Sequence, residues 1–237
     1  MKPEDIELAY KNALAPGQPF RFQCTQCGKC CKNREDILLN PYDLHRVSQA
    51  LGIPHDQVVS RYCTVYIGDS SRFPCVLLTP VGPEKACPLL KGNKCSVHRG
   101  KPTVCALYPL GRAIRCSTSH APTSPAEGEK SGMFYFLNGA TCGKNDEEHT
   151  VQEWLSEFDL QESEEWFLLW SEVLGDLAPR LMELEKKLSP KLMEPVFNAV
   201  FVGVYLNYQP FGSFLSQFKA NVEKVKGLLQ MVETGIK

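Results

Sequence analysis

Apolar side chains recur at helical spacing in the C-terminal part of the chain. Between Ser163 and Leu188 they return mostly every three or four residues, which predicts one long amphipathic helix that Pro179 bends or interrupts. The same spacing predicts a helix over about Pro195–Leu206 and another from Ser213 to about Val232. This part of the chain is therefore expected to form a set of packed helices.

Polar residues indicate where this helical part begins. Thr150, followed three residues later by Glu153, forms a capping box, in which each side chain accepts a hydrogen bond from the backbone N–H of the other residue. Large aromatic residues follow between Trp154 and Trp170. Because large aromatics mostly serve burial, we interpret them as core and not as a cofactor-binding box.

The N-terminal part predicts three short helices separated by turn residues. Glu4–Leu14 has a helical pattern that ends at a Pro-Gly pair. Asn40 is a favourable N-cap ahead of a helix over Pro41–Leu51. A proline also opens a helix over Pro54–Tyr62, and the histidines on these two helices, His45 and His55, are interpreted as surface residues.

Short stretches of β-forming residues follow these helices. They cover Pro74–Leu78, Ala113–Cys116 and Met133–Leu137, whereas the Pro-, Gly- and Ser-containing segment Ser117–Gly132 predicts an exposed loop. The predicted fold class is α+β, mostly helical with short strands. An irregular cysteine-rich, metal-binding domain would be followed by a C-terminal helical segment.

The cysteines are distributed unevenly along the chain. All eleven lie between Cys24 and Cys142, and the residues after Cys142 contain none. This change in composition predicts a boundary near Lys144–His149. We expect a cysteine-cluster domain over residues 1–146 and a helical region over residues 147–237 that packs on it.

Composition and charge narrow the class of protein. Hydrophobic residues make up 43% and charged residues 22% of the 237 residues, values typical of globular proteins with a sizeable core. A net charge of -1 gives no reason to expect a nucleic-acid or membrane partner. No apolar run approaches the about 18 residues of a membrane span, and the first residues contain no signal core. A cytoplasmic location is expected, and the oligomeric state is not predicted.

The first cysteine cluster places four thiols within eight residues. Cys24 and Cys27 form a C-x2-C turn, which directs two thiolates toward one metal, and Cys30 and Cys31 follow directly. Clustered cysteines in a reducing compartment indicate metal binding or redox chemistry more often than disulfides. Adjacent side chains rarely reach one tetrahedral ion. Cys30 and Cys31 therefore serve different metals, or one binds and the other packs.

A second group consists of Cys87, Cys95 and Cys105. The Gly92-Asn93-Lys94 turn predicts a small hairpin that brings Cys87 and Cys95 together. Pro102 begins a turn of helix that would deliver Cys105 to the same place.

These residues together resemble the YkgJ-type cysteine-cluster family, whose members are described as zinc- or iron-chelating domains. The resemblance covers about residues 20–145. It rests on the runs Phe22–Cys31, Cys87–Leu90 and Lys101–Pro109, with Cys95 between the last two. The chain departs from the family at Lys101 and Ala106, where arginine is common, and this weakens any expectation of a bound anionic substrate.

The resemblance nominates seven metal ligands, to which we add Cys142 as an eighth because the family has a late cysteine before its C-terminal helix. The set is Cys24, Cys27, Cys30, Cys31, Cys87, Cys95, Cys105 and Cys142. Cys116 and His98 are further candidates of lower rank. Cys63 and Cys75 are interpreted as buried small hydrophobic residues, which free cysteines often are.

The metal is expected to be iron in an iron–sulfur cluster of the 4Fe-4S class, with zinc as the alternative. Both use thiolates, but the second C-x2-C of a zinc ribbon is missing, which favours iron. No hydrolase triad, phosphate loop or dinucleotide fingerprint is present, so any activity would come from the metal.

Three functions remain open after this reading. Electron transfer or cofactor and metal handling, with another protein as partner, is favoured. A cluster-dependent protein-modifying enzyme is the first alternative, since flagellin lysine methylases carry a similar cysteine cluster. A zinc-stabilised interaction module without catalysis is the second. Whether the protein is an enzyme stays open.

Overall fold

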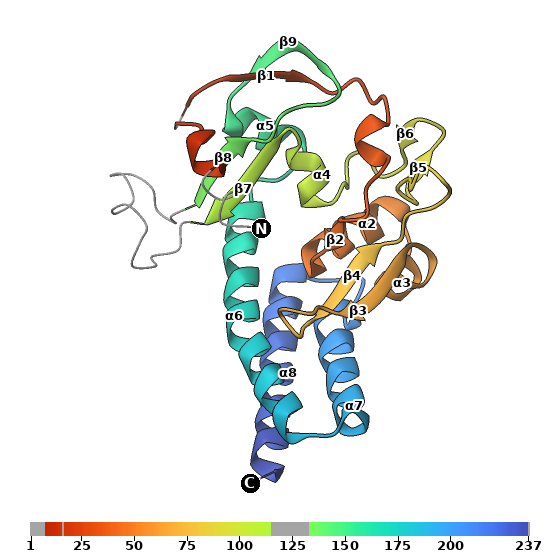
Figure 1. The fold of residues 1–237 in the computed structure, drawn as a ribbon, viewed down its shortest axis with the longest axis vertical. Helices are drawn as coiled ribbons and strands as arrows, with labels where there is room; N and C mark the ends of the chain where they lie inside the picture. The colour runs from red at the N-terminus through yellow and green to blue at the C-terminus, as the bar shows by residue number, and fades with distance from the viewer. Residues whose placement is uncertain (1–7, 16, 115–132, 237) are drawn as a thin grey trace. The chain divides into compact units, whose positions relative to one another are not determined.

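The computed structural model describes residues 8–15, 17–114 and 133–236 (Figure 1). The backbone forms two compact units, each built from two separate segments of the chain. Unit 1 contains Met1–Cys30 and Thr103–Gln161, and unit 2 contains Cys31–Pro102 and Glu162–Lys237. Helices and short strands together confirm the predicted α+β class. The predicted division into residues 1–146 and 147–237 rests on the cysteine distribution and stays a prediction.

Unit 1 contains two antiparallel strand pairs and two short helices. Strand β1 (Phe20–Gln23) pairs with β9 (Lys144–His149), and β7 (Leu110–Ile114) pairs with β8 (Met133–Leu137). The helices are α4 (Thr103–Leu107) and α5 (Val151–Glu157). Residues 8–11 are helical, within the predicted helix Glu4–Leu14, whose first residues lie outside the described part of the chain.

In unit 1 the predicted capping box and the predicted strands are confirmed. The backbone N–H of Thr150 donates to the Glu153 carboxylate over 2.7 Å, and the Glu153 N–H donates to the Thr150 hydroxyl over 3.3 Å. Strand β8 has the predicted bounds, and β7 begins three residues before the predicted Ala113. The predicted loop Ser117–Gly132 and Cys116 lie outside the described residues.

Trp154 is the centre of the aromatic core of unit 1. Its side chain is 1% exposed, and its ring contacts those of Phe20, Phe22 and Phe158 at centroid distances of 5.8, 5.6 and 5.3 Å. Its indole N–H donates to the carbonyl oxygens of Ala106 and Leu107 in α4, over 3.1 and 3.2 Å. One residue therefore joins α5 to both β1 and α4. Its burial confirms the core interpretation.

Unit 2 contains a small antiparallel sheet and a separate hairpin. The sheet has the strand order β2-β4-β3, formed by Leu38–Leu39, Pro74–Leu78 and Cys63–Ile67. The hairpin pairs β5 (Leu90–Lys91) with β6 (Lys94–Cys95). This confirms the hairpin predicted from the Gly92-Asn93 turn, in which Gly92 has a φ of 60°.

The remaining elements of unit 2 are helices. They are α2 (Pro41–Leu51), α3 (His55–Tyr62), α6 (Ser163–Lys187), α7 (Pro190–Phe201), the π-helical turn η2 (Val202–Leu206) and α8 (Phe214–Gly235). Asn40 caps α2 as predicted, since its side chain accepts from the Asp43 N–H over 2.8 Å. The same side chain accepts from the Trp166 indole over 3.2 Å, which links α2 to α6.

One proline prediction differs from the structure, and another is narrowed by it. Helix α6 continues through Pro179 without interruption, and the alternative that Pro179 bends the helix stays a prediction. Helix α7 begins at Pro190 and not at Pro195, because Ser189 and Pro190 supply the N-cap and first helical position of an earlier start. The prolines inside both helices show that packing of their apolar faces outweighs the lost backbone hydrogen bond.

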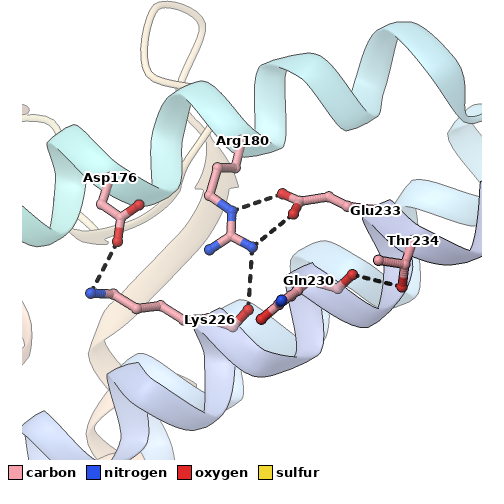
Figure 2. A network of polar contacts seen from close by, with 6 residues as sticks. All are labelled: Asp176, Arg180, Lys226, Gln230, Glu233 and Thr234. Carbon is pink, nitrogen blue, oxygen red and sulfur yellow. Dashed lines mark hydrogen bonds and ion pairs between the residues drawn. The ribbon is translucent and has the colours of Figure 1, made fainter.

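Helices α6 and α8 lie side by side and are joined by a polar network (Figure 2). The Arg180 guanidinium binds both carboxylate oxygens of Glu233, over 2.7 and 2.9 Å, and donates to the Lys226 carbonyl oxygen. The Lys226 ammonium lies 3.0 Å from the Asp176 carboxylate. These contacts are partly exposed, so they contribute modestly to stability and mainly fix the register of the two helices.

The interpretation of His45 and His55 as surface residues is wrong. His55 is 7% exposed, and its Nδ1 donates to the Tyr205 carbonyl oxygen over 3.0 Å. Its Nε2 lies 3.3 Å from Nδ1 of the half-buried His45, whose ring stacks on Phe214 at 4.3 Å. A carbonyl can only accept, so His55 Nδ1 carries a proton, and in the neutral ring Nε2 accepts from His45. The lowered pKa values of both rings favour this neutral pair.

This pair predicts a loss of stability at acidic pH. Burial lowers the pKa of His45 from 6.5 to about 4, and repulsion from His55 and Arg46 lowers it further. Burial also lowers the pKa of His55, although the Tyr205 carbonyl and the Asp56 carboxylate oppose this decrease. Below pH 6.5 the unfolded chain binds more protons than the folded chain. The free energy of unfolding therefore decreases as the pH decreases. Between about pH 7 and about pH 5 we expect His45 to cost about 1–2 kcal/mol of the free energy of unfolding.

Urea unfolding at several pH values checks this prediction. The variant His45→Gln should show a shallower decline of the free energy of unfolding with falling pH than wild type. A Gln49→Ala variant serves as the control, because this exposed residue of α2 carries no titratable group. Equal slopes for wild type and His45→Gln would contradict the prediction.

Candidate metal centre

The pairing of β1 with β9 brings together the segments of Cys24 and Cys142, the first and last cysteines of unit 1. Gln23, the last residue of β1, lies opposite Lys144, the first residue of β9. Cys24 therefore leaves the strand pair at the same end at which Cys142 and Gly143 enter it. The backbone register explains how a cysteine late in the chain joins the first cluster.

Left-handed residues shape the turn between Cys24 and Cys27. Gln26 has a φ of 51° and Gly28 a φ of 72°, and the one-turn 3-10 helix Lys29–Cys31 follows. Residues other than glycine rarely adopt positive φ, so the turn at Gln26 is a specific local constraint. The backbone N–H of Lys29, just after this turn, acts on the Cys27 thiol.

Hydrogen bonds favour the thiolate form of Cys27. The backbone N–H of Lys29 lowers the pKa of Cys27 most, against the opposing effect of burial, and Thr25, Cys142 and the N–H of Gly143 lower it further. Burial raises the pKa of Cys142, and the charges of Cys30 and Cys27 add to this increase. The side chains of Cys27 and Cys142 thus share a hydrogen bond, and the charge of Cys30 acts on Cys142 as well.

Tyr108 connects α4, which carries Cys105, to the segment of Cys142. Its hydroxyl accepts from the Thr141 N–H over 2.7 Å and lies 3.7 Å from the Cys142 Sγ. Its ring contacts Phe22 edge-on at 5.6 Å. Tyr108 therefore links three segments of unit 1: β1 ahead of Cys24, α4 with Cys105, and the segment of Cys142.

Gly143 allows the close approach of β9 to β1 beside Cys142. Its φ is 84°, and a Cβ at this position would lie 2.7 Å from the Gln23 carbonyl oxygen and would overlap the Phe22 ring. We expect Gly143→Ala to lose about 1–2 kcal/mol to backbone strain and about 1–3 kcal/mol more to overpacking. Thermal unfolding measures the total. Gly139→Ala is a matched control, because Gly139 has a φ of 60° with nothing within 4 Å of its Cβ position. Equal losses for both variants would contradict the steric argument.

In unit 2, backbone hydrogen bonds connect three of the predicted ligand residues. The Cys87 N–H donates to the Cys31 carbonyl oxygen over 2.7 Å. The Leu90 N–H donates to the Cys87 carbonyl oxygen over 3.0 Å, and Leu90 lies opposite Cys95 in the β5–β6 hairpin. Cys31 therefore belongs with Cys87 and Cys95, whereas its neighbour Cys30 lies with Cys27 and Cys142.

The two cysteines interpreted as small hydrophobic residues have different surroundings. Cys75 lies in β4, where its thiol donates to the Phe73 carbonyl oxygen over 3.4 Å. Cys63 is the first residue of β3, and burial raises the pKa of its thiol to about 12, with the charge of Cys87 adding to the increase. Sequence reasoning missed the proximity of Cys63 to Cys87, because no motif spacing connects them.

The predicted ligands thus divide between the units. Unit 1 holds Cys24, Cys27, Cys30, Cys105 and Cys142, and unit 2 holds Cys31, Cys87 and Cys95. The predicted meeting of Cys105 with Cys87 and Cys95 stays a prediction. So does a ligand role for the half-buried His98, whose pKa is lowered by burial and by the neighbouring charges of Lys101 and Arg99.

The chemistry of these donors fits a thiolate-bound metal. The ten described cysteines are free of disulfides and all are half-buried, which suits soft metal ligands shielded from water. Within residues 8–15, 17–114 and 133–236, no three His, Cys, Asp or Glu side chains are grouped closely enough to hold an ion. A ligand sphere would therefore have to close when the metal binds, and the free energy of metal binding would drive that closure.

Comparison with known proteins agrees with this chemistry. Residues 23–130 match the family described as "CxxCxxCC: Putative zinc- or iron-chelating domain". The family is the YkgJ-type family expected from the motifs, so that prediction is confirmed. The matched segment contains seven of the eight predicted ligands, and Cys142 lies beyond its end.

A relative of unassigned role supports the same region. The "Uncharacterized protein MJ0661" of Methanocaldococcus jannaschii is 29% identical over 121 residues, and the match covers 48% of this chain and 56% of the relative. The chain thus spans little more than half the length of that relative. No solved structure matches the chain. Among the described helices, none is long and apolar enough to cross a membrane.

Proposed function

We propose that the protein binds an iron–sulfur cluster through the thiolates of unit 1 and serves in electron transfer or cofactor handling. The ligands in this proposal are Cys24, Cys27, Cys30 and Cys142. The observation that carries it is the register of β1 and β9, which brings the segment of Cys142 to the start of the first cluster, where backbone N–H groups lower the pKa of Cys27. Four thiolates are the usual ligands of such clusters.

The hydrogen bonds to Cys27 suit a thiolate-bound metal. N–H groups that act on a ligand sulfur stabilise its negative charge, and in a cluster they also tune the reduction potential. The Lys29 and Gly143 N–H groups act on Cys27 in this way. Zinc-bound thiolates gain from the same N–H groups, so the preference for iron rests on the missing second C-x2-C of a zinc ribbon.

A bound cluster would supply one-electron chemistry, while the chain would supply its ligands and control access to it. Phe22 and Tyr108 place aromatic cover beside the thiols of unit 1, and Tyr108 places a hydroxyl against Cys142. Such a centre requires a donor or acceptor for its electron. We propose that this partner is another protein, and that both work in the cytoplasm, where thiols stay reduced.

Metal and acid-labile sulfide analysis of protein purified without oxygen tests this function. We expect iron and sulfide in similar amounts and a broad visible absorption that bleaches on reduction. Exposure to air should release iron from the wild-type protein. Zinc alone, in a colourless protein, would contradict the cluster and would favour a zinc-stabilised interaction module. Protein that holds no metal after reconstitution with either ion would contradict the function as a whole.

A further inference from the structure

We propose that the β5–β6 hairpin and the loop after it form a docking surface for an acidic segment of a protein partner. The surface consists of Lys91, Lys94 and Arg99, all in unit 2, and is called the cationic surface below. This inference deepens the proposed function and rests on it for the existence of a protein partner, whose chemistry it specifies. It needs no metal and no ligand role for any cysteine.

The three cations of this surface lie where the chain lacks carboxylates. Residues 85–102 contain no Asp or Glu, and Lys91, Lys94 and Arg99 are all exposed. The surface of a soluble protein usually has charges of both signs interspersed. This part of unit 2 therefore carries a positive potential that its own residues do not neutralise.

Lysines that precede the hairpin are neutralised, unlike those of the cationic surface. Lys32 pairs with Glu84 over 2.8 Å, and Lys85 pairs with Glu35 over 2.6 Å. In the described part of the chain, no carboxylate forms an ion pair with the cationic surface. The carboxylates that complement this surface would therefore come from a partner.

The register of the hairpin places two like charges against each other. Lys91 and Lys94 are directly opposite partners across the turn of Gly92 and Asn93. Like charges at directly opposite positions of a strand pair are destabilising. A carboxylate bound to both ammonium groups would remove this repulsion, so an acidic ligand would stabilise the hairpin.

Short connections keep the third cation close to the other two. The Ser96 N–H and hydroxyl both donate to the Leu89 carbonyl oxygen, over 2.9 and 2.8 Å, and so extend the hairpin beyond β6. Arg99 follows three residues after Ser96. Even a fully extended chain would separate these two residues by at most about 11 Å.

Arg46 of α2 holds the loop after the hairpin in place. Its guanidinium donates to the carbonyl oxygens of Arg99 and Lys101, over 3.0 and 3.2 Å. Gly100 between them packs so closely on α2 that a Cβ would lie 2.6 Å from the Cβ of Ala50. A surface fixed in this way loses little conformational entropy on binding, which favours affinity.

Composition favours the carboxylates of a protein over the phosphates of a nucleic acid. Residues 85–102 contain no Phe, Tyr or Trp, the side chains on which the bases of single strands stack. A duplex requires many cations along its backbone, whereas the whole chain has 26 Lys and Arg against 27 Asp and Glu. An acidic protein segment needs only a few carboxylates to complement three cations.

Binding of decaglutamate to the full chain tests the inference. Fluorescence anisotropy of the labelled peptide measures Kd for wild type, for Lys91→Gln/Lys94→Gln/Arg99→Gln and for the control Lys186→Gln/Lys191→Gln/Lys219→Gln. The control removes the same charge from exposed positions elsewhere in unit 2. We expect the surface variant to bind about tenfold more weakly than wild type, and the control to bind as tightly as wild type. Salt at about 0.15 M should weaken wild-type binding relative to about 0.01 M.

Thermal unfolding shows whether the surface variant still folds. Because its substitutions remove a like-charge pair, it should be at least as stable as wild type. Absence of decaglutamate binding by wild type at low salt would overturn the inference, and so would equal losses in both triple variants. Tighter binding of decathymidylate than of decaglutamate would also overturn it, in favour of a nucleic-acid partner.

Iron and sulfide analysis of the same preparations separates this inference from the proposed function. A chain that holds a cluster but does not bind decaglutamate would overturn the cationic surface alone. A chain that binds decaglutamate through this surface but holds no iron would support the inference and overturn the cluster.

Discussion

Cys27→Ser is expected to lose most of the metal held by unit 1 and to expose its N-terminal segment to protease. The thiolate of Cys27 is stabilised by the N–H groups of Lys29 and Gly143, and a serine hydroxyl is not ionised at neutral pH. Loss of an outer-shell partner already costs about 10- to 100-fold in metal affinity, so loss of a ligand should cost more. Because metal binding and local folding are coupled, the peptide around Lys29 should become a cleavage site.

Metal content and limited trypsin digestion check this prediction together. Wild type loaded with metal, wild type after chelation, Cys27→Ser and the control Cys75→Ser are compared under the same conditions. Cys27→Ser should resemble chelated wild type, and Cys75→Ser should resemble loaded wild type. If Cys27→Ser kept both full metal content and full resistance to trypsin, Cys27 would not be a ligand.

Trp154→Ala is expected to be the most destabilising single substitution in unit 1. The side chain is 1% exposed and is surrounded by the rings of Phe20, Phe22 and Phe158. Removal of a buried tryptophan typically costs about 3–5 kcal/mol of the free energy of unfolding. The loss should spread to α4, because the indole N–H binds the carbonyl oxygens of Ala106 and Leu107 next to Cys105.

Two variants separate the packing effect from the hydrogen bonds. Trp154→Phe keeps much of the ring and loses the indole donor, so it should cost about 1–3 kcal/mol through the unsatisfied carbonyls. Trp170→Ala, at a half-buried position of unit 2, is the control for loss of a tryptophan as such. Urea unfolding followed by far-UV circular dichroism measures all three. A Trp154→Ala variant within about 1 kcal/mol of wild type would contradict the central role of this residue.

Elements with strong local signals could be predicted from the sequence. Helix α2 has the predicted bounds because Asn40 and Pro41 define its start and Gly52, with a φ of 65°, defines its end. Strand β9 was not predicted, since its residues Lys144–His149 are almost all charged and resemble a linker. It is a strand because β1 supplies the backbone partners, and such long-range pairing leaves no trace in local composition.

The candidate site likewise has features that the sequence predicts and features that it does not. The first cluster and the Cys87–Cys95 hairpin follow from spacing alone, and Cys142 follows from the family resemblance. The proximity of Cys63 to Cys87 depends on how β3, β4 and the following bridge align, and this is a property of register. The sequence likewise predicts surface positions for His45 and His55, which form a pair in the structure. Helical periodicity does not show which other element packs against a given face of a helix.

The discontinuous make-up of the two units has a consequence for their order of completion on the ribosome. Unit 1 has all of its residues once Gln161 has been synthesised, whereas unit 2 begins at Cys31 but lacks α6, α7 and α8 until the last residues have been added. Domains generally fold as units when their chain has emerged. The cysteines of unit 2 therefore leave the exit tunnel before α6, α7 and α8 have been synthesised, and we expect their thiols to be open to metal exchange and oxidation at that stage.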